Sequence, residues 1–162
     1  MATTHRTLSV HDVALLEAPR SVRFSTALWL TAVGAGIAES VLGATEAATS
    51  GSVGWPALAA QIAFRTIVYG GLLVVIAKYF RRGRNWSRIA LTGLLGVVGL
   101  ATLIEGPIGW LAGDGKFSEL DLDAGFVAFA VIRSVHILSV LAGLVLMYRP
   151  DANRWFRVVR HA

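Results

Sequence analysis

Four long runs of apolar residues, separated by shorter polar stretches, dominate the hydropathy pattern of this chain. They cover approximately residues 24–44, 55–80, 89–112 and 125–148. A helix needs about 20 apolar residues to cross the hydrocarbon core of a bilayer, and each run reaches that length. The pattern therefore predicts an all-α fold, a membrane-embedded four-helix bundle formed by residues 23–149. A segment at 1–22, either a short interfacial helix or disordered, precedes the bundle, and a tail at 150–162 follows it. We expect a short flexible loop at 45–54 and a turn in the acidic link 113–124. The basic and aromatic residues of 154–160 predict that this part of the tail lies along the membrane surface.

The composition agrees with a bilayer as solvent. Hydrophobic residues make up 55% of the chain and charged residues 15%, with a mean hydropathy of +0.63. These values belong to membrane proteins and not to globular domains. The chain has 162 residues, which leaves no room for a separate catalytic domain beside four spans. The absence of cysteine excludes disulfides, iron–sulfur centres and thiolate catalysis.

The basic residues are unevenly distributed among the polar stretches. Twelve of the 15 lie before the first run, between the second and third, or after the fourth; the other two links hold only Lys116 against five acids. The positive-inside rule then predicts that both termini and the central loop are cytoplasmic. The basic charge thus indicates orientation and anionic-lipid contact, not nucleic-acid binding. The predicted headgroup contacts are Arg81, Arg82, Arg84, Arg88, Arg154 and Arg157.

The chain also shows signs of an internal repeat. Glu39 and Glu105 lie near the same end of the first and third runs, and each is followed four residues later by glycine. Arg65 and Arg133 lie about a third of the way along the second and fourth runs, 68 residues apart. Two tandem transmembrane hairpins, related by an axis along the membrane normal, fit this pattern.

Three short segments resemble a known group of proteins. They are Pro19-Arg20-Ser21-Val22 with Leu28-Trp29-Leu30, Gly83-Arg84-Asn85-Trp86-Ser87-Arg88, and Tyr148-Arg149-Pro150 with Asn153-Arg154-Trp155-Phe156. Over roughly residues 19–157 the pattern is similar to that of small four-helix integral membrane proteins of actinobacteria with no established function. The resemblance implies a four-helix fold and a bacterial plasma-membrane location. It implies no activity.

Six residues with charged, amide or imidazole side chains within the predicted spans form a candidate polar cluster. They are Glu39, Gln61, Arg65, Glu105, Arg133 and His136. Their spacing along helices predicts that they meet in the outer half of one bundle, since ionised groups in a membrane face the interior and pair. The pairs form either within hairpins, Glu39 with Arg65 and Glu105 with Arg133, or across the two repeats. The cluster serves either as structural ion pairs or as a binding site.

Small and aromatic residues indicate how the helices pack. Ala32, Gly36 and Ser40 recur every four residues on the first span, which lets another helix approach closely and directs the adjacent Glu39 toward protein. The five tryptophans lie near predicted span boundaries and are interpreted as interfacial anchors.

The sequence indicates a protein without catalytic residues. It contains no HExxH motif, no cysteine nucleophile and no paired histidines on one span, and we expect no metal or cofactor. A non-enzymatic accessory or assembly subunit fits best, with membrane lipids and a larger membrane complex, or further copies of itself, as partners. One alternative is a small proton-coupled or amphipathic-compound transporter that acts as an oligomer. A third is a haem- or quinone-linked redox subunit, for which only His136 lies at a suitable depth.

Overall fold

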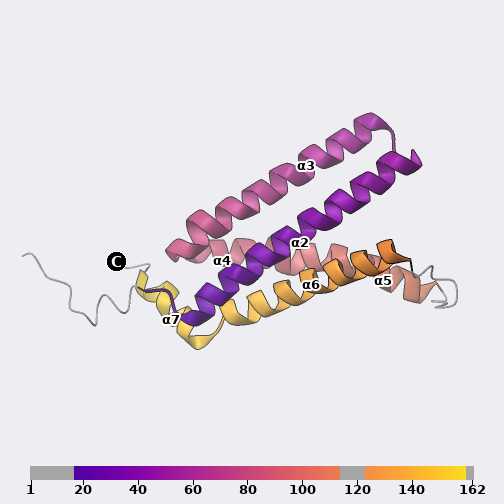
Figure 1. Cartoon of the computed structure of the whole chain (residues 1–162). Helices are drawn as coiled ribbons and strands as arrows, with labels where there is room; N and C mark the ends of the chain where they lie inside the picture. The colour runs from indigo at the N-terminus through magenta and orange to yellow at the C-terminus, as the bar shows by residue number, and fades with distance from the viewer. Residues whose placement is uncertain (1–16, 114–122, 160–162) are drawn as a thin grey trace, which may run out of the picture.

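The computed structural model describes residues 17–113 and 123–159, and every element in these two ranges is helical (Figure 1). The elements in chain order are α2 (Arg20–Ser50), α3 (Trp55–Val74), η1 (Val75–Tyr79), η2 (Phe80–Arg82), α4 (Asn85–Leu91), η3 (Thr92–Gly99), α5 (Leu100–Ala112), α6 (Ala124–Met147) and α7 (Pro150–Val159). The prediction of an all-α fold is confirmed for this part of the chain.

Four continuous helical stretches are long and apolar enough to cross a membrane. They cover Arg20–Ser50, Trp55–Arg82, Asn85–Ala112 and Ala124–Met147. The predicted runs agree with these bounds to within a few residues at most ends. The exception is the end of α2, where the polar stretch 45–54 was expected to be a flexible loop. The helix instead continues to Ser50 and ends at Gly51, whose φ of +64° favours glycine.

Several sequence expectations fall on residues outside the two described ranges. They concern the structure of residues 1–16, the turn in the acidic stretch 114–122 and the last residues of the tail, 160–162.

Two of the long stretches contain π-helical segments that the apolar pattern does not signal. η1 follows α3 directly, and η3 joins α4 to α5 in a region that holds Gly93, Gly96 and Gly99. Glycine brings no side chain to the helix surface, and at Gly96 a Cβ atom would lie 3.0 Å from a methyl carbon of Leu144 in α6. The wider helical turn thus coincides with a place where two helices approach closely.

The main apolar core lies toward the end of the bundle where α7 packs. Its buried members are Val22, Trp29, Ala32, Val33, Leu72, Ile76, Phe80, Leu91, Leu95, Val140, Met147, Ala152, Trp155 and Phe156. Trp29 is fully buried and packs against Gly143 of α6, where a Cβ atom would lie 3.3 Å from the indole ring. The interpretation of Trp29 and Trp155 as interfacial anchors is therefore wrong, because both rings fill the core.

The helix α7 closes this end of the bundle. The tail was expected to lie along the membrane surface, but α7 buries Ala152, Trp155 and Phe156 against the core, while Arg154 and Arg157 stay exposed. Gly83, in the turn after η2, lies directly under α7: a Cβ atom there would lie 2.8 Å from a Val159 side-chain carbon. The tail is thus amphipathic and packs on protein.

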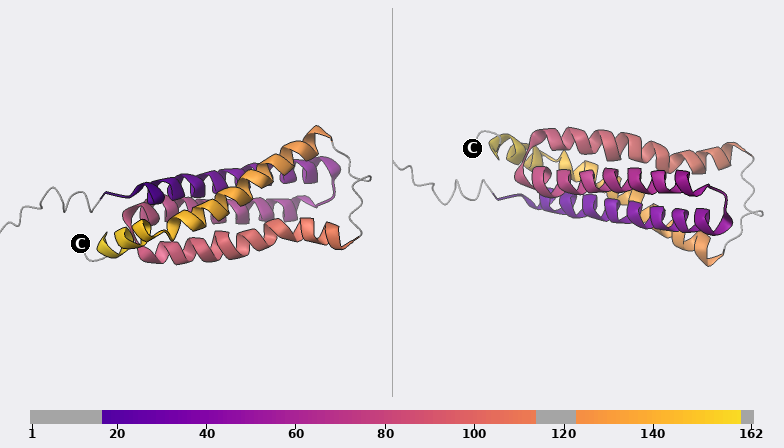
Figure 2. Two further views of the ribbon diagram at one scale, coloured as in Figure 1. Left: turned by 90° about the horizontal axis from the view of Figure 1, so that it is seen from below. Right: turned by 90° about the horizontal axis from the view of Figure 1, so that it is seen from above.

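The opposite end of the bundle is open. There α2 and α3 lean away from α5 and α6 as a hairpin (Figure 1). Figure 2 shows the same helices from below and from above, with α2 and α3 running alongside each other. Contacts between α2 and α6 are extensive, whereas those between α2 and α3 are fewer. Of the twenty residues of α3, only Leu58 and Leu72 are buried. The hairpin is therefore held mainly through α2.

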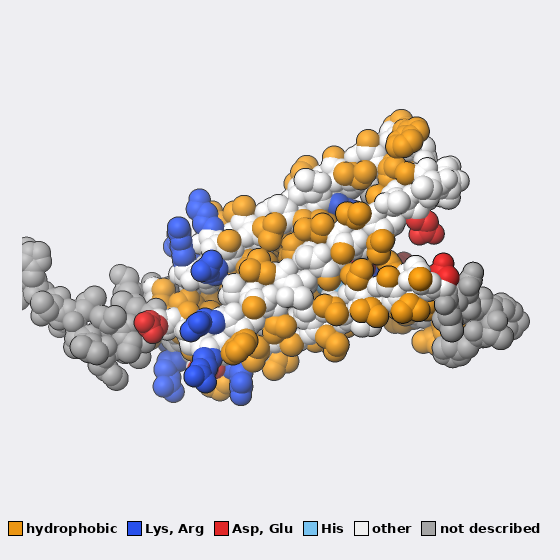
Figure 3. All heavy atoms as spheres, in the orientation of Figure 1, with side chains coloured by type: hydrophobic (Ala, Val, Ile, Leu, Met, Phe, Trp, Pro, Cys, Tyr) orange, Lys and Arg blue, Asp and Glu red, His pale blue; other side chains and the backbone are white. Residues whose placement is uncertain are grey.

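The charged side chains of the described residues gather at the two ends. Lys and Arg cluster at the end that carries α7, with acidic side chains among them, whereas the charged side chains in view at the other end are Asp and Glu (Figure 3). We call these the basic end and the acidic end. Hydrophobic side chains are spread over the surface between them (Figure 3). Phe64, Ile67, Val98 and Leu138 are among the large hydrophobic residues that are exposed.

Candidate functional site

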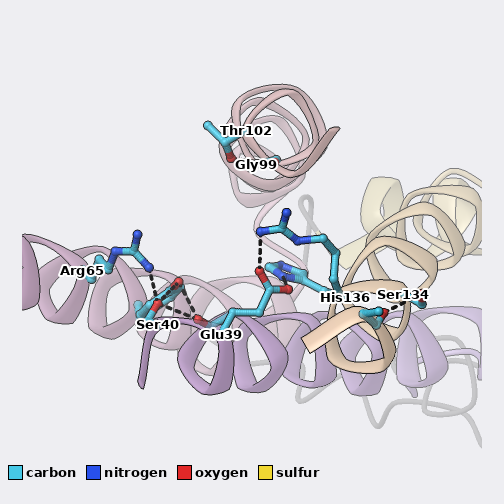
Figure 4. Close-up of polar contacts among 11 residues, drawn as sticks. Glu39, Ser40, Arg65, Gly99, Thr102, Ser134 and His136 are labelled. Carbon is cyan, nitrogen blue, oxygen red and sulfur yellow. Dashed lines mark hydrogen bonds and ion pairs between the residues drawn. The ribbon is translucent and has the colours of Figure 1, made fainter. Parts of the chain in front are cut away.

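The polar residues between the two ends centre on Glu39 of α2. The carboxylate is 8% exposed and meets two side chains of α6. Arg133 Nη2 donates to Glu39 Oε2 over 3.2 Å, and His136 Nδ1 lies 3.3 Å from Glu39 Oε1. Arg133 and His136 are three residues apart and therefore share a helix face. Figure 4 shows the Glu39 side chain extending from α2 to these partners.

Arg133 is further held by aromatic and backbone surroundings. Its guanidinium carbon lies 4.4 Å from the centroid of the Phe129 ring, at cation–π distance. Its Nη1 atom lies 3.8 Å from the position of a Cβ atom at Gly106 of α5. Since α5 carries glycine there, the guanidinium fits between α6 and α5. The pair Glu39–Arg133 thus joins the first hairpin to the second.

A second network lies beside the first, between α2 and α3. Arg65 Nη1 donates to Ser40 Oγ over 2.7 Å, and Ser40 Oγ lies 2.9 Å from Tyr69 OH (Figure 4). The Tyr69 hydroxyl in turn donates to the Gly36 carbonyl over 2.9 Å. These bonds satisfy the two hydroxyl groups between the helices. Arg65 itself binds a neutral partner and no carboxylate of the described residues.

Gly36 is the point where three helices meet. A Cβ atom at this position would lie 3.0 Å from His136 Cε1 and 3.1 Å from the Tyr69 ring and hydroxyl. Any side chain larger than hydrogen would therefore push α6 or α3 away from α2. Gly36 fixes the distance at which the two polar networks form.

The structure brings together some of the six predicted residues. Glu39, Arg133 and His136 form one contact group, and Arg65 lies next to it through Ser40. Glu105 is exposed on α5, and no ion pair joins it to another described residue. Gln61 is exposed on α3, one turn from Arg65. Glu39 pairs with Arg133 and not with Arg65, so its ion pair crosses between the two predicted repeats.

A groove of about 700 Å³ runs along the α2–α3 hairpin. Apolar side chains form most of its walls, among them Ile37, Val41, Leu58, Ile62 and Leu73. Its polar groups come from Ser40, Gln61, Arg65, Tyr69 and threonines of both helices. A volume of about 300–1,000 Å³ is typical of sites that hold a small molecule.

The predicted headgroup contacts occupy the basic end, and five of the six are exposed there: Arg81, Arg82, Arg84, Arg154 and Arg157. Arg88 differs. It is 6% exposed, and its Nη2 donates to the Met147 carbonyl over 3.0 Å and to Asn153 Oδ1, while Nη1 donates to Asn85 Oδ1 over 3.2 Å. The Arg88 guanidinium therefore binds acceptors of the protein and not lipid headgroups. The carbonyls at the end of α6 need such a donor because no further helical turn supplies one.

The two polar networks can form ion pairs and bind a charged group, but they contain few side chains suited to metal binding or catalysis. Within residues 17–113 and 123–159, no set of three or more histidine, cysteine and acidic side chains could hold a metal ion. Sequence reasoning found the charged members of the site but missed Tyr69. The signal for Tyr69 was its position four residues after Arg65, on the same helix face.

Comparison of the chain with family models, with curated proteins and with solved structures finds no match.

Proposed function

We propose that this chain is a multi-pass protein of the bacterial plasma membrane, with both termini cytoplasmic, that works as a non-catalytic assembly subunit. In this proposal the α2–α3 groove receives a membrane-embedded helix of a partner. Four apolar helices of spanning length support the membrane location. The position of basic residues at one end supports the orientation, and the resemblance to small actinobacterial membrane proteins supports the bacterial setting.

One observation carries the proposal: Arg65 lines an apolar groove in the middle of a span and has no carboxylate partner among the described residues. An ionised side chain within the membrane costs at least about 2.5–3.5 kcal/mol unless it is paired or hydrated. An acidic side chain on a partner helix would supply the missing charge. The walls of the groove would then pack against that helix, with Ser40, Ala44 and Ala48 allowing close approach.

A photo-crosslinking amino acid in the groove tests this function. Placed at Ile62, which lines the groove, it should link the chain to another polypeptide in native membranes. Placed at Ile67, which is 73% exposed on the same helix and outside the groove, it should link only to lipid. Lipid adducts alone from both positions would contradict the proposal.

One observation favours a second function, proton-coupled transport. The Glu39 carboxylate and the His136 imidazole are 3.3 Å apart within the apolar part of the bundle, so a proton could pass between them. In reconstituted vesicles such a carrier should show pH-driven uptake that Glu39→Gln abolishes. Uptake that survives the substitution, or its absence in the unmodified protein, would leave the assembly function as the one supported.

A further inference from the structure

Of the six polar residues predicted to form the cluster, two charged side chains have no charged partner among the described residues. Arg65 lines the groove on α2 and α3, and Glu105 is exposed on α5. Among the described residues, Arg65 donates a hydrogen bond to the hydroxyl of Ser40, and Glu105 forms no ion pair. Their charges are opposite. An arginine and a glutamate of two different copies would therefore be suitable partners for an ion pair.

A path of direct contacts leads from Arg65 toward the helix that carries Glu105. Arg65 binds Ser40, which is next to Glu39 in α2; Glu39 binds Arg133, whose guanidinium lies beside Gly106 in α5. This path of direct contacts crosses the bundle from α3 to α5. We infer from it that, in a second copy with the same orientation in the membrane, Glu105 lies near the depth of Arg65.

The surface around Glu105 suits insertion into a groove. Ala101, Glu105 and Gly109 follow one another at intervals of four residues and are all exposed. A Cβ atom at Gly109 would meet nothing within 4 Å, so no part of the described chain covers that row. Ile104 and Ile108 flank the row and are 41% and 56% exposed. Small residues beside a polar one, bordered by branched apolar ones, favour close helix packing in a membrane.

From these observations we propose that the groove of one copy receives α5 of a second copy, with Glu105 of the second copy paired to Arg65 of the first. The inference rests on the assembly function proposed above and names the partner for that same groove. Because the groove and α5 are different surfaces, the contact repeats from copy to copy. It closes as a reciprocal dimer or as a ring about an axis along the membrane normal.

The pairing also accounts for the unequal use of the four charges. Glu39 and Arg133 cross between the two hairpins within one chain, and Arg65 and Glu105 would cross between chains. Bidentate contact between guanidinium and carboxylate is strong in a medium of low polarity, so the second pair would hold the assembly and fix its register.

A charge exchange tests the proposal. The number of copies would be counted by single-molecule photobleaching of labelled protein in nanodiscs formed directly from membranes. The unmodified chain should be oligomeric, Arg65→Glu and Glu105→Arg should each give monomers, and the double variant should be oligomeric again. A monomeric unmodified chain, or single variants that stay oligomeric, would overturn the proposal, as would a folded double variant that stays monomeric.

Cysteine pairing provides a test that leaves both charges in place. The chain has no native cysteine, so Ile62→Cys in one copy and Ile108→Cys in a co-expressed copy form the only thiols. We expect oxidation to join the two copies. The matched pair Ile67→Cys with Ile108→Cys places the first thiol outside the groove and should stay unjoined.

The outcomes separate this inference from the proposed function. If the crosslinker at Ile62 captures a different protein and the cysteine pair does not form, the second copy is excluded while the assembly function stands. If the crosslinker captures only lipid or an amphipathic small molecule, both proposals fail. If it captures a second copy and the cysteine pair forms, both are supported.

Discussion

A single carboxylate, that of Glu39, joins the two hairpins. Both of its oxygens are used, one by Arg133 and one by His136, and the residue is 8% exposed. Removal of one member of a buried ion pair leaves the other charge without compensation, which costs more than the pair contributes when intact. Losing one member of the Glu39–Arg133 pair should therefore destabilise the protein more than losing both.

Glu39→Gln should lower the free energy of unfolding, by less than the roughly 3–5 kcal/mol for a fully buried pair, because Arg133 loses its counter-charge while 26% exposed. The double variant Glu39→Gln with Arg133→Met should recover much of this loss. Equilibrium unfolding in mixed micelles measures both. Glu46→Gln, at an exposed position of the same helix, is the control and should leave stability unchanged. A double variant no more stable than Glu39→Gln would speak against the pairing.

Gly36→Ala should lower stability by about 1–3 kcal/mol, because the new methyl group would lie 3.0–3.1 Å from His136 and Tyr69. Gly34→Ala is a matched control two residues away, since nothing lies within 4 Å of its Cβ position. Thermal unfolding in detergent compares the two. Equal effects at both positions would show that helix propensity, and not close approach, decides the outcome.

At the scale of elements, Arg88 organises the ends of three helices. It stands in α4 and donates to the last residue of α6, Met147, and to Asn153 in α7. Its guanidinium carbon also lies 4.6 Å and 4.8 Å from the ring centroids of Tyr148 and Phe156. The guanidinium spreads five donors over a rigid plane and can reach acceptors that lie apart, whereas the lysine ammonium has three donors on a single nitrogen.

Arg88→Lys should therefore loosen α7 from the bundle although it keeps the charge. We expect a loss of about 1.5–3 kcal/mol, the range for hydrogen bonds that involve a charged group. Hydrogen exchange should show faster amide exchange in α7 than in the unmodified protein. Arg84→Lys, at an exposed neighbouring position, should leave exchange in α7 unchanged. Unchanged protection of α7 in Arg88→Lys would rule out the bridging role.

At the scale of the whole molecule, the two ends differ in charge and in packing. The basic end contains the core, α7 and the Arg88 contacts, whereas at the acidic end the α2–α3 hairpin leans away from the rest (Figures 1 and 3). Because the bundle is packed at the basic end and opens toward the acidic end, the groove lies in the half of the bundle away from the basic residues. In the proposed orientation, with the basic end cytoplasmic, that half would lie in the outer leaflet.

Single cysteines should report this orientation, since the chain has none of its own. A membrane-impermeant maleimide should label Ser52→Cys, in the link between α2 and α3, on intact spheroplasts. It should label Arg157→Cys, in α7, only after the membrane is broken. The opposite pattern would reverse the proposed topology, and labelling of both sites on intact spheroplasts would contradict it.

The sequence was sufficient to predict the helices because their apolar runs are long and their ends are marked by charge or glycine. It also located Glu39, Arg65 and Arg133 correctly within the spans. It could not predict which partners they choose, because helices of a bundle can be arranged in several ways with the same charges at the same depth. The contact of Glu39 with α6 depends on the close approach at Gly36, which is a property of three helices together.

Residues at the basic end were misjudged for a related reason. Trp29 and Arg88 lie where interfacial anchors and headgroup contacts are usual, and residue type and position alone suggest those roles. Both are buried because α7 folds back over this end and covers them. The amphipathic pattern of α7 is the same for a helix on a membrane surface and for one on a protein surface, so the sequence does not separate the two.

The length of α2 has a consequence for the lipid environment. Its 31 residues correspond to about 46 Å, against about 30 Å for the hydrocarbon core of a typical bilayer. A helix that exceeds the hydrocarbon thickness tilts or protrudes, and the degree varies with the lipid. Because α2 carries α3 with it, a thinner bilayer would spread the hairpin further and a thicker one would draw it upright. Acyl-chain length would thereby tune the angle between the hairpin and the rest of the bundle, so the tilt of the groove would depend on membrane thickness.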